Sequence, residues 1–249
     1  MITKPRVGRG REGSSMESIA ADGAAASGSG GPRAGAAPQG NEPAATASLC
    51  MNCDVRTRCL GGAAAAAGTV QLRGILAGHH ALRRSEVLYQ PGEPFEHVYA
   101  VRAGALKSVV RGGGAEEVRG FHFPGELVGV DGMADGRHRV ALVALEEVQL
   151  CAVRFAPRGG DCGGARALLA RLWDMMSCEV VRERTHHSLL ATLPASRRVR
   201  AFLASVASRM RRRGTAALPP ALTEADVASY LGLPVDGMRA ALEGALPHP

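Results

Sequence analysis

The sequence predicts an α+β protein: a small β-barrel or double sheet, then a long helix, then a C-terminal pair of short helices. Short apolar segments separated by Gly and Pro fill the middle of the 249-residue chain, which is typical of antiparallel β-structure. Apolar residues then recur at three- and four-residue steps from Ala165 to about Leu190, which predicts a helix. The length suffices for two modest domains, each with its own core.

Composition and charge limit the classes of function. The 30 Lys+Arg against 23 Asp+Glu give a formal net charge of +7, which favours a polyanionic partner, with a solvated basic surface as the alternative. No apolar run reaches the roughly 18 residues of a membrane-spanning helix and no signal peptide is recognisable, so we expect a cytoplasmic protein without a membrane partner. The sequence offers no Ser-His-Asp context, phosphate-cradling glycine loop or HExxH motif, and we expect no enzymatic activity.

The chain divides into four stretches. Residues 1–48 consist mainly of small and polar residues, which bury too little to offset the entropy of ordering, and we expect a disordered tail. Residues 49–163 hold a cysteine-rich loop and the β-module, residues 164–193 the long helix, and residues 194–249 the C-terminal helices.

Four cysteines are the strongest chemical signal. Cys50, Cys53 and Cys59 form a C-x2-C-x5-C run, and Cys151 follows almost a hundred residues later. Three thiolates on one loop and a distant fourth suit tetrahedral zinc or an iron–sulfur cluster better than disulfides, since the chain lacks a secretion signal. Spacing alone leaves iron and zinc open, and His79 could complete a zinc site.

The β-module is predicted from five apolar segments and the turns between them. The segments are residues 87–89, 97–101, 105–110, 127–130 and 148–153, and the turns are Pro91-Gly92, Gly112-Gly113-Gly114 and Pro124-Gly125. Cys151 falls on the last segment, which gives it a rigid position towards which the cysteine loop can fold.

The long helix carries one stripe that begins apolar and ends polar. The stripe contains Leu172, Met176, Val180, Glu183 and His187. It indicates either a helix-to-helix dimer interface or packing against the β-module. After Pro194, residues 196–213 predict a second helix with one apolar face, which contains Val199, Phe202, Leu203, Val206 and Met210. The opposite face is rich in arginine and could lie on phosphates, on solvent or on a membrane surface.

Residues 222–242 predict a helix, a tight turn and a second helix. Thr223 can cap the first helix with Asp226 at the third position, and Gly232 suits the turn because glycine adopts a left-handed conformation at little cost. The pattern is that of a helix-turn-helix, whose second helix enters the DNA major groove; a plain helical hairpin is the alternative.

In this order of elements the chain resembles the CRP/FNR superfamily of bacterial transcription regulators, and within it the FNR type. The resemblance extends from about Cys50 to Leu246. Its most specific segments are the cysteine run, Tyr99 to Ser108, Gly120 to Gly129, Cys151, and Tyr230-Leu231-Gly232-Leu233.

The resemblance implies a sensor domain of the cyclic-nucleotide-binding type, a double-stranded β-helix, in which Cys50, Cys53, Cys59 and Cys151 ligate an oxygen-labile [4Fe-4S] cluster. Zinc is the alternative metal. The resemblance also implies a homodimer, with double-stranded DNA as ligand and RNA polymerase as a further partner. The dimer would form through Leu172, Met176, Val180 and Glu183. Oxygen would destroy the cluster and favour monomers, and repulsion between the two Glu183 side chains would leave the dimer marginal.

Several residues depart from the family pattern. Arg139-Val140 replaces the Arg-Ser pair that binds nucleotide phosphate, so we expect no cyclic nucleotide. Val235, Asp236 and Arg239 are the expected DNA contacts, but their types differ from the usual ones.

The chain also stops at Pro249, where a β-hairpin wing would follow. We therefore expect weak or altered DNA binding, and the alternative function is a zinc-stabilised or cluster-bearing dimer that has lost specific DNA binding.

Overall fold

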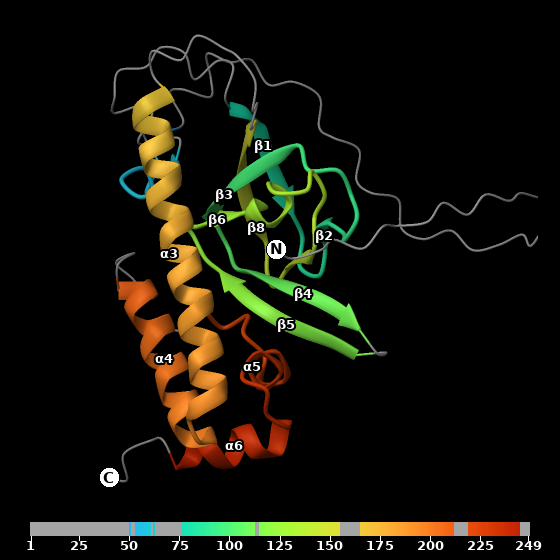
Figure 1. Cartoon of the computed structure of the whole chain (residues 1–249), viewed down its shortest axis with the longest axis vertical. Helices are drawn as coiled ribbons and strands as arrows, with labels where there is room; N and C mark the ends of the chain where they lie inside the picture. Colours follow the sequence, from blue (N-terminus) through green and yellow to red (C-terminus); the bar gives the residue numbers. More distant parts are fainter. Residues whose placement is uncertain are drawn as a thin grey trace, which may run out of the picture. The chain divides into compact units, whose positions relative to one another are not determined.

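The computed structural model describes residues 50, 53–60, 62, 76–112, 115–154, 165–211 and 219–244, all of them within one compact unit, Ala37–Pro249. The predicted tail of residues 1–48 lies outside the described residues, and so does Cys162. In Figure 1 the long helix α3 runs beside the β-module, with the shorter helices at its C-terminal end.

Eight strands form two four-stranded antiparallel sheets, ordered β1-β8-β3-β6 and β2-β7-β4-β5. Their bounds are β1 Leu76–Leu82, β2 Val87–Tyr89, β3 His97–Ala103, β4 Leu106–Gly112, β5 Ala115–His122, β6 Leu127–Val128, β7 Ala141–Ala144 and β8 Val148–Arg154. The β-barrel prediction was wrong about closure, because no ladder joins the two sheets within the described residues. Edge strands β6 and β2 have only two and three residues and so offer few backbone groups for a ladder between the sheets.

Five strands follow the predicted segments, and three were missed. The segment 127–130 ends early, because a 3₁₀ turn, Val130–Gly132, replaces its last residue. The missed strands β1 and β5 lack the apolar alternation that identifies a strand: β1 contains Gly78-His79-His80, and β5 begins with Ala115-Glu116-Glu117. Their pairing with β8 and β4 decides their conformation, not their own propensity. The missed β7 is a four-residue apolar run that pairs with β4, and so short a run does not by itself distinguish a strand from a buried helix segment.

The predicted helices are confirmed. α3 spans Ala165–Thr192 and α4 spans Ala195–Arg211, with Pro194 between them. α4 buries Val199, Phe202, Val206 and Met210, in agreement with the predicted apolar face. None of the helices in the described ranges has both the length and the apolar character needed to cross a bilayer.

Two short helices follow, α5 (Glu224–Tyr230) and α6 (Val235–Glu243). The Thr223 hydroxyl accepts a hydrogen bond from Asp226 N at 3.1 Å, which confirms the predicted cap. Gly232 adopts φ +61°, as the tight turn requires. Pro234 caps α6 without a side-chain hydrogen bond. The two helices and their turn are present, whereas their binding to DNA stays a prediction.

One hydrophobic cluster joins the C-terminal helices to the second sheet. It includes Val109 and Phe121 from the sheet, Phe202 from α4, Leu231 after α5 and Met238 from α6. Figure 1 shows α5 beside the β4–β5 hairpin. The helix pair therefore packs directly on the β-module.

Candidate functional site

The four predicted ligand cysteines line one pocket. Cys50, Cys53 and Cys59 come from the loop before β1, and Cys151 comes from β8. The loop cysteines are between 6 and 9% exposed, and Cys151 is partly buried. The folded chain thus brings together residues separated by almost a hundred positions, whereas their role as metal ligands stays a prediction. The other lining residues are Val55, His79, Ala100, Val101, Arg102 and Val153.

The cysteine loop is held by its own backbone. Cys59 N donates to Val55 O at 2.9 Å, and Arg56 N donates to Cys53 O at 3.0 Å. Gly62 N donates to Cys59 Sγ at 3.2 Å. A Cβ atom at position 62 would lie 1.8 Å from Arg56 O, so only glycine permits this close approach. The loop therefore presents Cys59 inward with a backbone donor already on its sulfur.

The four thiols influence one another's pKa values in this pocket. Burial raises the pKa of the Cys151 thiol to about 12, and the charges of Cys50, Cys59 and Cys53 add to the rise. Burial, then Cys59 and Cys53, likewise raise the pKa of Cys50. Arg102 acts in the opposite direction on both thiols. Four thiolates in this pocket require a cationic group to offset their mutual repulsion, as a metal centre does.

The donor set fits a metal centre of soft character. Four thiols converge on one buried space, which suits zinc or an iron–sulfur cluster. In the described residues no three His, Cys, Asp or Glu side chains are arranged to hold a single metal ion. The side chains leave about 10 Å³ of free space in the pocket, roughly one water molecule. Binding of a larger group therefore requires the loop to move away from β8.

The cysteine loop contacts α3 directly, and this was not predicted. Val55 and Leu60 of the loop share a hydrophobic cluster with Leu172 of α3, and Arg171 Nη2 donates to Arg58 O at 2.6 Å. In Figure 1 the loop, drawn in blue, lies beside α3. A change in the loop must therefore alter the packing of α3.

The predicted dimer stripe divides into a buried part and an exposed part. Leu172 is 7% exposed and belongs to the chain's own core, and Met176 packs against the same cluster. Leu172 is therefore unavailable to a partner, contrary to our expectation, because the cysteine loop and the first sheet already cover it. Val180 is 51% exposed, and Glu183 is exposed as well.

The sequence pattern did not identify two further apolar residues on the exposed part of α3. Trp173 is 72% exposed and Val181 is 64% exposed. Trp173 and Val180 are seven residues apart, so they lie on nearly the same face of the helix.

A charge cluster connects the β-module, α3 and α4. Glu126 accepts from Arg209 Nε at 2.9 Å and from Arg209 Nη2 at 2.6 Å, and Arg182 Nη1 lies 3.4 Å away. Arg209 also lies over the Phe123 ring, 4.4 Å from its centroid. Sequence reasoning missed this cluster because 83 residues separate Glu126 from Arg209.

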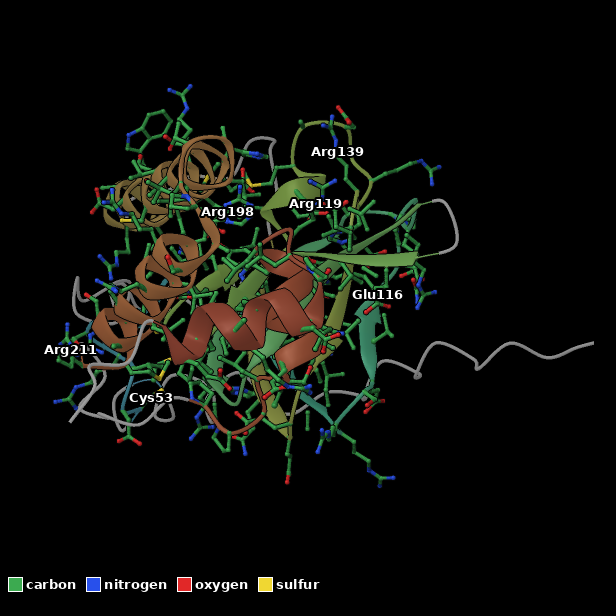
Figure 2. The ribbon with its side chains drawn as sticks, turned by 90° about the horizontal axis from the view of Figure 1, so that it is seen from below. Cys53, Glu116, Arg119, Arg139, Arg198 and Arg211 are labelled. Carbon is green, nitrogen blue, oxygen red and sulfur yellow. The ribbon has the colours of Figure 1, made fainter. Side chains whose placement is uncertain are left out.

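The predicted DNA contacts lie on α6. Val235 is 37% exposed, and the Asp236 side chain is 97% exposed. Arg239 Nε donates to Glu224 Oε2 at 2.8 Å, so α5 holds this arginine. Figure 2, seen from the α6 end, shows Arg211 of α4 reaching outward. Arg198 instead donates to Leu193 O and Leu231 O, which gives it a structural role.

Arg139, the residue that remains of the family's phosphate-binding Arg-Ser pair, lies at the surface. Its guanidinium forms an exposed ion pair with Asp135, and its backbone N donates to Asp131 Oδ2 at 2.8 Å. Figure 2 shows Arg139 at the periphery of the molecule.

Comparisons with known proteins agree with this architecture. The cyclic nucleotide-binding domain family matches residues 79–156. The transcriptional activator protein Anr of Pseudomonas aeruginosa is 32% identical over 190 residues, which cover 75% of this chain and 78% of that protein. The anaerobic regulatory protein of Haemophilus influenzae is 28% identical over 190 residues, 75% of this chain and 74% of that protein.

Among solved structures, FixK2 from Bradyrhizobium japonicum is similar, with a TM-score of 0.59 and 29% identity, covering 67% of this chain and 82% of that chain. The two-sheet module and the helices after it follow the architecture of this group. The chain therefore belongs to the CRP/FNR family of transcription regulators and is not an enzyme.

Proposed function

We propose that the chain is an oxygen- or redox-responsive transcription regulator of the FNR type, which binds DNA as a homodimer in the cytoplasm. The observation that carries this proposal is the convergence of Cys50, Cys53 and Cys59 with Cys151 in one pocket. The relatives named anaerobic regulatory protein and transcriptional activator support it.

The four thiolates would hold a [4Fe-4S] cluster. When bound, the cluster supplies an oxygen-labile centre that ties the cysteine loop to β8. In a cluster each thiolate binds a different iron, whereas zinc requires all four around one ion. The described side chains hold no arrangement ready for a single ion, and the loop has to move to admit a cluster, so the choice of the cluster over zinc is supported by the relatives named as anaerobic regulators and not by this geometry.

The chain's own residues provide the link from the loop to the dimer. Val55 and Leu60 pack on Leu172, so release of the loop removes apolar contacts from one side of α3. The exposed face of α3, formed by Trp173, Val180 and Val181, is the proposed dimer interface. Glu183 beside it repels its counterpart and keeps the dimer marginal.

DNA binding would use α6 and the exposed arginines of α4. Arg239 must leave Glu224 before it can reach a base edge, which weakens its contribution. This pairing, together with Gly237 in α6, favours one second candidate: a cluster-bearing or zinc-stabilised dimer that has lost specific DNA binding. RNA polymerase is a proposed partner because a relative is named as an activator.

We propose no cyclic-nucleotide ligand, although the matched family has that name. Val140 supplies no hydroxyl for the phosphate, and Arg139 forms an ion pair with Asp135 at the surface. A nucleotide phosphate would have to displace this ion pair.

The proposed function is tested by oligomeric state and DNA binding measured without oxygen and again after exposure to air. A library of randomised duplex DNA serves as the probe, because the target sequence is not assumed. We expect an anaerobic dimer that enriches a two-fold symmetric sequence, and loss of both properties in air or in Cys151→Ala. Cys178→Ala, which removes an exposed cysteine, should behave as the wild type. A dimer insensitive to air, or one that enriches no sequence, would contradict the proposal.

A further inference from the structure

We propose that His79 donates a hydrogen bond from Nδ1 to the Cys151 sulfur and is a positioning residue of the cluster site. The inference rests on the proposed function, because it concerns the same four thiolates. The contact itself is a property of the protein chain: Nδ1 lies 3.4 Å from Cys151 Sγ.

The contact is built into the sheet. His79 of β1 and Cys151 of β8 are directly opposed in the antiparallel register. Opposed residues project from the same face of a sheet, so the two side chains are brought together by backbone pairing and not by a mobile loop. Both residues line the cysteine pocket.

The direction of the hydrogen bond follows from the chemistry of the acceptor. A ligating thiolate carries no proton, so it can only accept, and the facing Nδ1 must carry the hydrogen. Nε2 of the same neutral ring then carries none. Nε2 is then a buried acceptor, and it has no hydrogen-bond partner within the described part of the chain. The direction of the bond to Cys151 therefore rests on the thiolate, which can only accept.

The donor would act on a defined property of the site. Hydrogen bonds to the sulfurs withdraw electron density from a cluster and raise its reduction potential. Cys59 Sγ receives Gly62 N–H in the same way. Within the described residues, the loop and the sheet thus each supply one donor to a ligand sulfur.

The test compares His79→Leu, His79→Gln and His80→Leu with the wild type. Leucine removes the donor, and glutamine retains an N–H group. His80 is the matched control, since it is the neighbouring histidine, opposes Leu150 instead, and packs edge-on against Tyr99. In the cluster-loaded protein, the midpoint potential is measured by anaerobic redox titration followed by electron paramagnetic resonance.

We expect His79→Leu to lower the reduction equilibrium constant roughly tenfold, about 59 mV for a one-electron couple. His79→Gln and His80→Leu should stay near the wild-type value. An unchanged potential in His79→Leu would overturn the inference. Equal shifts in the leucine and glutamine variants would also overturn it, because they would show a role of ring volume only.

A second readout needs no cluster and separates this inference from the proposed function. In the metal-free chain, alkylation of Cys151 by iodoacetamide is followed by peptide mass spectrometry at one pH. A donor that stabilises the thiolate should make Cys151 react about threefold faster in the wild type than in His79→Leu, with unchanged rates at Cys50 and Cys53. If the wild type binds no iron, the proposed function fails, and this rate comparison alone decides the role of His79.

Discussion

Lys107 on β4 and Asp226 on α5 form an ion pair with Nζ 2.6 Å from Oδ1, so the β-module and the C-terminal helix pair are joined directly. The two side chains are only 15 and 13% exposed. Ser229 Oγ of α5 also accepts from Val118 N of β5 at 3.0 Å. The helix pair proposed to bind DNA is therefore fixed to the sheet by polar contacts as well as by its apolar core.

The first prediction concerns that ion pair. Burial opposes the charge of Lys107, but the hydrogen bonds that its ammonium group donates to Asp226 and Glu116 outweigh burial and raise the Lys107 pKa. Lys107→Met leaves both carboxylates without this partner and should lower the free energy of unfolding by about 2 kcal/mol. Urea denaturation measures this change.

Arg111→Met is the control for this prediction. Arg111 is 62% exposed and 3.8 Å from Glu116, so its loss should cost less than about 0.5 kcal/mol. Equal losses of stability in the two variants would show that the buried Lys107 ion pairs contribute no more than the exposed Arg111 pair.

The second prediction separates the two parts of the α3 stripe. Leu172→Ala opens a cavity in the chain's own core and should lower the free energy of unfolding by about 2–5 kcal/mol. Val180→Asp places a charge on the exposed face and should leave the monomer's stability nearly unchanged while it prevents dimerisation. Sedimentation velocity and thermal denaturation of both variants check this. A Val180→Asp protein that still dimerises would show that the interface lies elsewhere.

The third prediction concerns the link between Glu126 and α4. Arg209 is 16% exposed and makes a two-point contact with Glu126, so Arg209→Met should weaken the attachment of α4 to the β-module. Hydrogen exchange should become roughly tenfold faster in the α4 backbone. Arg211→Met, on the exposed side of the same helix, should leave exchange unchanged. Unchanged exchange rates in Arg209→Met would show that the contact with Glu126 does not hold α4 on the β-module.

The fourth prediction is a pH dependence of stability. Burial and the charge of Arg182 lower the pKa of His122 to about 3, below its value of 6.5 in the unfolded chain. The unfolded chain then binds a proton that the folded chain does not, so the contribution is complete above pH 6.5 and is lost as the pH falls towards 3. Burial and His187 lower the pKa of His186 to about 4, which adds a loss in the same direction.

Urea denaturation of the metal-free protein between pH 7.5 and 5.0 measures this effect. His122 should account for about 2 kcal/mol of the decrease, and His122→Gln should reduce the slope correspondingly. The same slope in the variant would mean that His122 is not kept neutral by the fold.

The sequence predicted the elements whose signal is local. The spacing of the loop cysteines indicated a metal centre, and the Thr223 cap and Gly232 turn indicated two short helices; the cap and turn are confirmed. Cys151 was assigned to the loop cysteines through the resemblance to the CRP/FNR superfamily, since the count of cysteines alone does not select it over Cys162 or Cys178. The structure places all four cysteines in one pocket.

What depends on strand register or on helix rotation was not predictable. His79 faces Cys151 only because β1 pairs with β8, and β1 has no strand signal of its own. Leu172 and Val180 were assigned to one stripe, yet eight residues rotate a helix by about 80° beyond two full turns, enough to bury one and expose the other. The Glu126–Arg209 contact requires the placement of α4 on the β-module, which no local pattern encodes.

The most direct test of the central claim is the iron, sulfide and zinc content of the protein purified without oxygen, together with its visible absorption spectrum before and after air. We predict about four irons and four sulfides per chain, with a colour that bleaches in air. Stoichiometric zinc in a colourless, air-stable protein would contradict the proposal and make Cys50, Cys53, Cys59 and Cys151 a structural zinc site.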